Sequence, residues 1–215
     1  MGTLLNRRRY MGGAKEQGYI QDGLVFWLDG IDKGSNEGYW TDLKGGCQYS
    51  YPASGTTVLD KGVEFTSQVT MRLASGTVPN NSGYTIEVCF VKSGGGTPTG
   101  VFSIESAAPS GSIAVAIYNN KNMFMQRQKC ILENPTLDSL SMYSYNLDVC
   151  CVNGNQGTFT STDYWSVNQN YVGVGAILYS RGIIGIIHSI RIYNRKLSLL
   201  EMKHNQSIDS QRFGT

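Results

Sequence analysis

Short apolar segments separated by turn residues recur through most of this chain and limit what it can fold into. In residues 84–91 the side chains alternate, with Tyr84, Ile86, Val88 and Phe90 on one face. Alternation of this kind places every second side chain on the same face of a strand, so one face can lie in a core. About ten to twelve such segments are present, which predicts an all-β sandwich.

Turn residues support the same prediction. The 215 residues include 26 glycines, and only 16% of them are charged. Asn153–Gly154 ends an apolar alternation, which is typical of a tight hairpin turn. The interpretation places one long strand over residues 142–152 and a flexible hairpin or loop over residues 93–98. A chain of this length can bury an adequate core without disulfide staples.

The two ends of the chain carry the most specific patterns. An apolar segment in Gly23–Gly34 is followed by Trp40–Gly46, and the strand in Gly185–Asn205 leads into a helix. Ser198 and Glu201 have the spacing of a capping box at the start of that helix. Together these patterns resemble the two ends of a concanavalin A-like, laminin-G-like (LamG) jelly-roll domain.

This resemblance implies a two-sheet antiparallel jelly-roll sandwich with a short C-terminal helix, in a fold used mostly for binding. We expect a basic arm over residues 1–22, the sandwich over residues 23–205 and a C-terminal extension over residues 206–215. Both ends of the chain are basic and the middle is acidic. Because terminal strands usually lie side by side in this fold, the resemblance implies one basic pole that could dock an acidic partner. A solvated pole without a partner is the alternative.

A second resemblance concerns residues 4–13, which precede the domain. They are similar to the basic arm of small structural proteins from phages of gut bacteria. This implies a virion component, such as a head fibre, capsid-decorating or tail-associated protein, that assembles in the host cytoplasm. Arg7, Arg8 and Arg9 would attach it to other virion proteins, and a homo-oligomer, a trimer by analogy, would bind host glycans. Neither a membrane nor a specific nucleic acid is expected as a partner, and deleting residues 1–20 should leave a folded domain.

Catalytic patterns are missing from the sequence. Glucanases of this fold place paired carboxylates on one strand, about 5 Å apart across the bond in retaining enzymes, but Glu87, Glu105 and Asp148 each stand alone. His188 is expected to be a packed strand residue, and His204 to lie near the C-terminus of the helix. We therefore expect a protein that is not an enzyme and that needs no cofactor. A free-standing bacterial carbohydrate-binding protein is the alternative, and a glycoside hydrolase is disfavoured.

Possible ligand sites are of two kinds. Asp29, Asp32 and Asp42 are close in sequence and carry the oxygen ligands that Ca²⁺ prefers, although hydrogen bonds to turn amides are the favoured interpretation and no metal is expected. Sugar binding needs exposed aromatic rings. The candidates are Tyr39, Trp40, Tyr164 and Trp165. Core packing remains the alternative for both tryptophans, and is preferred for Trp40.

The chain has five cysteines and no CxxC pair. The interpretation is that they are free buried thiols of a protein that folds in a reducing compartment.

Overall fold

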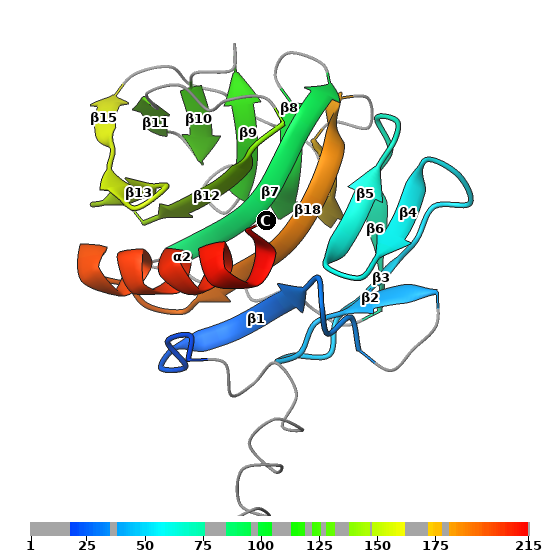
Figure 1. Ribbon diagram of the computed structural model, residues 1–215, viewed down its shortest axis with the longest axis horizontal. Coiled ribbons are helices and arrows are strands. Elements are labelled where there is room, and N and C mark those ends of the chain that lie inside the picture. The colour runs from blue at the N-terminus through cyan, green and yellow to red at the C-terminus, as the bar shows by residue number, and fades with distance from the viewer. Residues whose placement is uncertain are drawn as a thin grey trace, which may run out of the picture.

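The computed structural model describes residues 18–34, 38–75, 85–95, 99–104, 113–118, 122–125, 128–131, 138–146, 148–161, 172–177 and 181–214. These residues form two β-sheets that face each other, with one helix on the outer face of the first sheet (Figure 1). The fold class predicted from the sequence is therefore confirmed. Within these ranges, no helix has the length and apolar character needed to span a membrane.

The first sheet is built around two long strands, β7 and β18, which pair antiparallel over most of their length. Its strands are β1 (Leu24–Asp29), β4 (Thr56–Leu59), β5 (Gly62–Phe65), β7 (Thr85–Gly95), β12 (Leu140–Tyr145), β13 (Cys150–Val152), β14 (Asn155–Gln156) and β18 (Arg181–Tyr193). On one side of this pair, β12, β13 and β14 follow β7. On the other side, β18 pairs with β1 along one half and with β5 along the other. β4 lies beyond β5.

The second sheet has the order β2, β3, β6, β16, β8, β9, β10, β11 and β15. Its strands are β2 (Tyr39–Thr41), β3 (Gln48–Ser50), β6 (Met71–Ser75), β8 (Thr99–Ile104), β9 (Ile113–Tyr118), β10 (Asn122–Met125), β11 (Gln128–Ile131), β15 (Thr158–Ser161) and β16 (Val172–Val174). A further short strand, β17 (Ala176–Ile177), pairs with the start of β18 and joins the two sheets. The one parallel pairing in the described part of the chain links Gly182 of β18 to Gly100 of β8.

Two strand boundaries differ from the sequence prediction. β7 continues to Gly95, into the segment expected to be a hairpin or loop, because Gly94 and Gly95 pair with the start of β18. A Cβ atom on Gly95, which has φ +117°, would lie 2.5 Å from the Gly182 carbonyl oxygen, so this close approach requires glycine. The expected strand over residues 142–152 is two strands, because the Asn146 side chain accepts hydrogen bonds from two following amides and turns the chain.

The predicted hairpin turn and the predicted helix N-cap are both confirmed. Asn153 and Gly154 have φ of +47° and +80° and form the hairpin turn between β13 and β14. Helix α2 (Leu199–Phe213) begins with Ser198 as its N-cap, and Ser198 and Glu201 exchange the two hydrogen bonds of a capping box. The helix continues to Phe213, so residues 206–213 are helical. The sequence analysis expected His204 near the C-terminus of the helix. His204 instead lies in the first half of α2.

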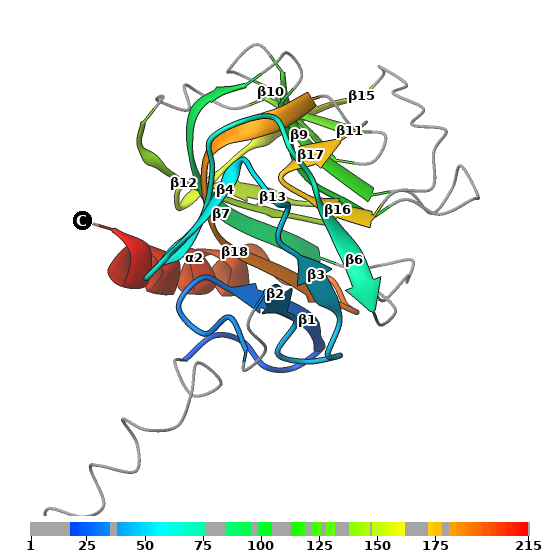
Figure 2. The same ribbon diagram turned by 90° about the vertical axis from the view of Figure 1, so that its right-hand side faces the viewer.

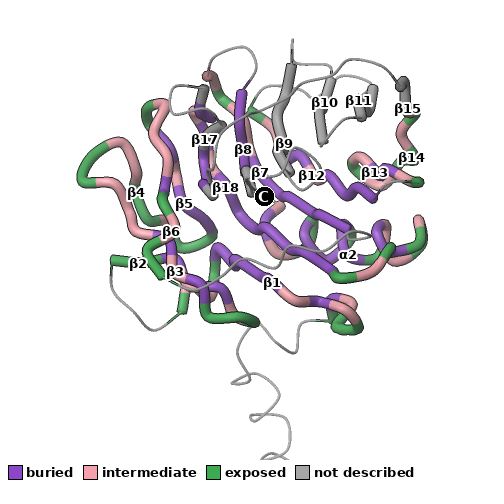
Figure 3. Tube along the Cα trace, turned by 180° about the vertical axis from the view of Figure 1, so that it is seen from behind, coloured by how far each residue is buried: buried purple, intermediate pink, exposed green. Residues whose placement is uncertain are grey.

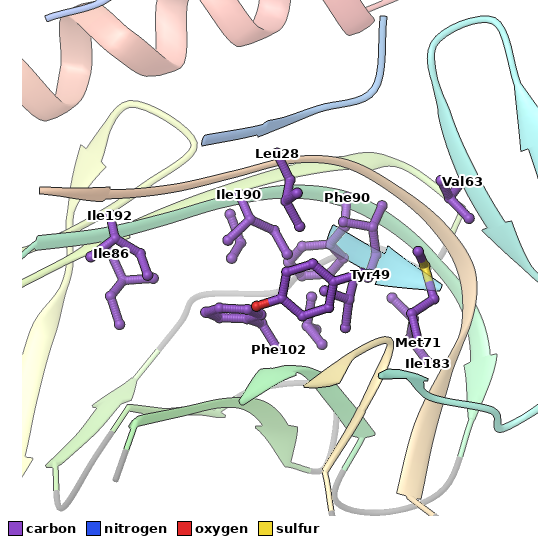
Figure 4. Close-up of a cluster of buried hydrophobic side chains, with 14 of the residues drawn as sticks. Leu28, Tyr49, Val63, Met71, Ile86, Phe90, Phe102, Ile183, Ile190 and Ile192 are labelled. Atoms are coloured by element: carbon purple, nitrogen blue, oxygen red, sulfur yellow. The ribbon is translucent and has the colours of Figure 1, made fainter. Parts of the chain in front are cut away.

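The main core lies between the two sheets and consists of alternate strand side chains, as the sequence pattern requires (Figure 4). Phe26, Leu28 and Ile190 from the first sheet face Tyr49 and Phe102 from the second. The side chains on the opposite face of the first sheet are also buried, because α2 covers them (Figures 2 and 3). This second buried layer includes polar and charged residues.

The cysteines are only partly as predicted. Cys47, Cys89 and Cys151 are free and buried. Cys150 forms a disulfide bond, so the expectation of free thiols throughout is wrong at this position. Cys150 and Cys151 point to opposite faces of β13, toward the main core and toward α2 respectively, as alternation requires.

Candidate functional site

Of the four aromatic candidates, the structure describes Tyr39 and Trp40. Tyr39 is 36% exposed on β2 and is available to a ligand. Trp40 is fully buried in the main core, and its indole Nε1 donates a hydrogen bond to the Asp29 carbonyl oxygen at 2.9 Å. It is therefore excluded as a sugar platform. Tyr164 and Trp165 lie outside the described residues, as do Arg7, Arg8, Arg9 and Glu105.

Trp40→Ala should lower the free energy of unfolding by about 3–5 kcal/mol, because the substitution leaves a large cavity between the sheets. Urea denaturation of the variant beside the unchanged protein measures this loss. A loss below about 1 kcal/mol would contradict the buried placement of the indole ring.

The three aspartates considered as calcium ligands are engaged in other interactions. Asp42 accepts hydrogen bonds from the amides of Trp27, Lys44 and Gly45. Asp29 caps the following turn and pairs with Arg212, while Asp32 accepts from the amide of Gly34. Among the described residues, no group of three or more His, Cys, Asp or Glu is placed to hold a metal ion.

A dense polar cluster lies between α2 and the outer face of the first sheet, and Arg191 of β18 is at its centre. The Arg191 Nε atom donates to Glu87 of β7 at 2.8 Å. Its two terminal nitrogens donate to the two carboxylate oxygens of Asp209 on α2, at 2.8 and 2.5 Å. All three side chains are about 1% exposed. Glu87 and Arg191 lie on the face of the sheet that points away from the main core. Arg191 binds Asp209 of the helix through charge-assisted hydrogen bonds.

Neutral side chains complete the hydrogen bonding around Glu87. Its Oε2 atom also accepts from Asn205 Nδ2 at 2.9 Å, and its Oε1 atom accepts from the Ser144 hydroxyl at 2.9 Å. Gln206 donates from Nε2 to the Ser144 hydroxyl and to the Cys151 carbonyl, each at 2.9 Å. The Gln206 Oε1 atom accepts from the Gly154 amide at 2.7 Å. The helix is therefore hydrogen-bonded to β7, β12, β13 and the turn at Asn153–Gly154.

The chain before β1 joins this cluster through Tyr19. The Tyr19 hydroxyl donates to Asp209 Oδ1 at 2.7 Å, and the Arg191 guanidinium lies 4.2 Å from the centre of its ring. Arg212 donates to the Tyr19 hydroxyl at 3.1 Å and forms two hydrogen bonds with the Asp29 carboxylate, at 2.7 and 3.0 Å. Residues of the predicted N-terminal arm and of the predicted C-terminal extension thus lie together in one buried cluster, which we call the helix-anchoring network.

The helix-anchoring network holds groups that often perform chemistry, namely carboxylates, arginines and phenols. Burial raises the pKa of the Glu87 carboxyl, an effect that the adjacent Arg191 partly offsets. Burial also raises the pKa of the Tyr19 hydroxyl. Glu87, Arg191 and Asp209 are buried, so a sugar cannot contact them from solvent. The helix-anchoring network holds α2 on the first sheet. The sequence analysis did not predict this network.

His188 is a packed strand residue, as predicted. It is buried beside α2, its Nδ1 lies 2.6 Å from the Lys61 carbonyl oxygen, and its ring stacks on Phe213 at 5.0 Å. Burial lowers its pKa below the ordinary value of 6.5, although Asp209 acts in the opposite direction.

The unfolded chain therefore binds a proton at His188 at a higher pH than the folded protein does, and folding stability should fall as the pH drops below about 6.5. Equilibrium unfolding in urea at pH 7.5, 6.5 and 5.5 measures this loss. His188→Asn can still donate to the Lys61 carbonyl but does not titrate, so its stability should change less over this range. Equal pH dependence of the two proteins would contradict the assignment.

Comparisons with known proteins place the fold. No protein-family model matches the sequence, and no curated protein matches it. Among solved structures, the sialidase of Trypanosoma rangeli in complex with sialic acid is similar, with a TM-score of 0.57 and 15% sequence identity over 88% of this chain. A mutant of that sialidase displaying trans-sialidase activity gives a TM-score of 0.52 and 14% identity over 90% of this chain. The chain spans only about a third of the length of these sialidases, 33% and 34% respectively.

A smaller domain gives a more complete match. The CBM40 domain of the Ruminococcus gnavus IT-sialidase, bound to α2,3-sialyllactose, is similar with a TM-score of 0.50 and 13% identity. The match covers 66% of this chain and 94% of that domain. At these identities the comparisons show the fold alone, a β-sandwich that these structures also contain.

One prediction from the sequence needs correction. The chain was expected not to be an enzyme because it lacks the carboxylate pattern of glucanases. Solved structures that contain a similar fold over about a third of their length include sialidases, which are glycoside hydrolases, so the missing glucanase pattern does not exclude enzyme activity. Sialidases can also use a tyrosine nucleophile in place of a carboxylate. The prediction of a non-enzyme is withdrawn.

Proposed function

We propose that this chain is a carbohydrate-binding β-sandwich. The observation that carries the proposal is the match to the CBM40 domain, because nearly the whole of that glycan-binding domain is covered by the sandwich described here. A binding module needs a stable frame and an exposed aromatic ring, and Tyr39 supplies such a ring on β2. Two of the three fold neighbours reported above are complexes with sialic acid or a sialylated sugar, so sialylated glycans are the first ligands to test.

The experiment is a binding assay of the purified full chain on immobilised glycans. The panel contains α2,3-sialyllactose, lactose as its neutral counterpart, and glucans. The proposal predicts saturable retention on at least one glycan that is competed by the same glycan in solution. The Trp40→Ala variant should lose binding only in proportion to its unfolded fraction. Absence of retention on every glycan of the panel, measured without competitor, would overturn the proposal.

A more specific role in a virion also remains a proposal. It is supported by the resemblance of residues 4–13 to phage structural proteins and by the basic cluster at Arg7, Arg8 and Arg9. Neighbouring genes for portal, capsid or tail proteins would support it, whereas a chromosomal context of sugar metabolism would favour a free-standing bacterial lectin. Sedimentation of the full chain tests the expected trimer, and a monomer would remove the argument that avidity strengthens weak sugar binding.

A further inference from the structure

The hairpin turn at Asn153–Gly154 carries a chemistry that neither the fold nor the proposed function uses. In an Asn–Gly pair the glycine amide nitrogen can attack the carbonyl carbon of the asparagine side chain, because glycine has no side chain to block the approach. This is the one such pair in the sequence. Asn153 is exposed, and a Cβ atom on Gly154 would meet nothing within 4 Å, so the turn is open to solvent.

The reaction needs only water. The Gly154 amide gives up its proton, and its nitrogen forms a bond to Asn153 Cγ while the side-chain nitrogen leaves as ammonia. Water then opens the five-membered succinimide ring at one of its two carbonyl carbons, and the product is aspartate or isoaspartate. No group is oxidised or reduced, and the net reaction converts one amide and one water molecule into a carboxylic acid and ammonia.

Two hydrogen bonds engage the reacting groups in the folded protein. The Gly154 amide donates to Gln206 Oε1 at 2.7 Å, so its proton is held by α2. The Asn153 Oδ1 atom accepts from the Met142 amide, also at 2.7 Å, which fixes the carboxamide against β12. A hydrogen-bonded amide loses its proton to base far more slowly than a free one, which is the basis of protection from hydrogen exchange. The first step of the reaction is therefore suppressed.

The Gln206 side chain is itself fixed in place. It is 2% exposed, and its Nε2 atom donates to the Ser144 hydroxyl and to the Cys151 carbonyl oxygen. These contacts keep Oε1 on the Gly154 amide as long as α2 lies beside the β13–β14 hairpin (Figure 1). The acceptor that protects the turn thus comes from a helix residue 52 positions further along the chain.

We propose that Asn153 is a latent deamidation site that Gln206 of α2 keeps closed. Loss of the helix contact would free the Gly154 amide and allow the reaction. An isoaspartate at position 153 adds one carbon to the main chain between β13 and β14, so the strand pairing across the turn and the contact with Gln206 can no longer both keep their geometry. Modification would therefore loosen the same helix contact that prevents it.

Incubation of the full chain in mildly alkaline buffer, followed by peptide mass spectrometry and isoaspartate analysis, tests the proposal. The folded chain should deamidate at Asn153 at least about tenfold more slowly than the same chain unfolded in guanidinium chloride. Gln206→Met keeps the side-chain volume but removes the amide acceptor, and should raise the rate in the folded state by about tenfold, the equivalent of one lost hydrogen bond. Hydrogen exchange at the Gly154 amide should accelerate in the same variant.

Two controls isolate the role of Gln206. Asn155 is exposed on the same hairpin but precedes Gln156, whose side chain hinders the attack, so its rate should stay low in every variant. Asn205→Ala removes hydrogen bonds from α2 to Glu87 and Tyr193 but leaves the contact with Gly154. The rate at Asn153 should then stay within about threefold of the unchanged protein.

Urea unfolding first establishes that both variants are folded. Equal deamidation of the folded and unfolded chains would show that the turn is not protected, and the proposal would be wrong. It would also be wrong if Gln206→Met left the rate unchanged, or if Asn205→Ala raised the rate as much as Gln206→Met. Should Gln206→Met not fold, hydrogen exchange in the unchanged protein decides. A Gly154 amide that exchanges as fast as in the unfolded chain would contradict the proposal, and a protected one would support it.

Discussion

Arg191→Met should lower the free energy of unfolding by about 3–5 kcal/mol, the largest effect expected of any single charge in the described part of the chain. The substitution keeps much of the side-chain volume but leaves the buried Glu87 and Asp209 carboxylates without their shared cation. Unpaired charges in a buried site are costly because they have lost their hydration. Urea unfolding followed by tryptophan fluorescence measures the loss.

The matched control is Lys196→Met, which breaks an exposed ion pair with Asp148. Exposed pairs contribute at most about 1 kcal/mol, so this variant should be nearly as stable as the unchanged protein. Equal stability of the Arg191 and Lys196 variants would show that the helix-anchoring network does not hold α2 on the sheet.

Deleting residues 1–20 should destabilise the domain by about 3–5 kcal/mol, although the sequence analysis expected a folded domain after this deletion. The deletion removes Tyr19, which is 3% exposed, contacts Trp27 edge to face at 5.4 Å and donates to Asp209. It also removes Ile20, whose amide donates to Asn205 at 3.0 Å. Thermal melting and urea unfolding of the purified proteins measure the loss.

Deleting residues 1–17 is the matched comparison, because it keeps Tyr19 and its contacts. We expect its stability to lie within about 1 kcal/mol of the full chain. Tyr19→Ala in the full chain should reproduce most of the effect of the longer deletion. If the two deletions prove equally stable, Tyr19 does not anchor the start of the domain.

Local patterns in the sequence were sufficient for much of the fold. Alternation predicted the β7 strand, Asn153–Gly154 predicted a hairpin, and Ser198 with Glu201 predicted the start of α2. Each of these depends on residues close together in the chain. The extension of β7 to Gly95 could not be predicted in this way, since it depends on pairing with Gly182–Ile184, nearly ninety residues away.

The helix-anchoring network is the clearest example of what sequence reasoning missed. Glu87 and Arg191 are 104 residues apart, and Tyr19 and Asp209 are 190 residues apart. A signal did exist, because Glu87 and Arg191 each interrupt an apolar strand at a position that faces away from the core. A charged residue in such a place needs a buried partner. Position in the sequence cannot say which residue that partner is.

The candidate sugar site was predicted only in part. Tyr39 is exposed as a ligand-binding ring must be, but the adjacent Trp40 belongs to the core because alternation turns it to the other face of β2.

The most direct test of glycan binding is an amide NMR titration of the uniformly ¹⁵N-labelled full chain with α2,3-sialyllactose. The account predicts saturable chemical-shift changes confined to one contiguous group of exposed residues. Chemical shifts that do not move at millimolar sugar, here and with a uronic acid disaccharide and lactose, would contradict a carbohydrate-binding function for this β-sandwich.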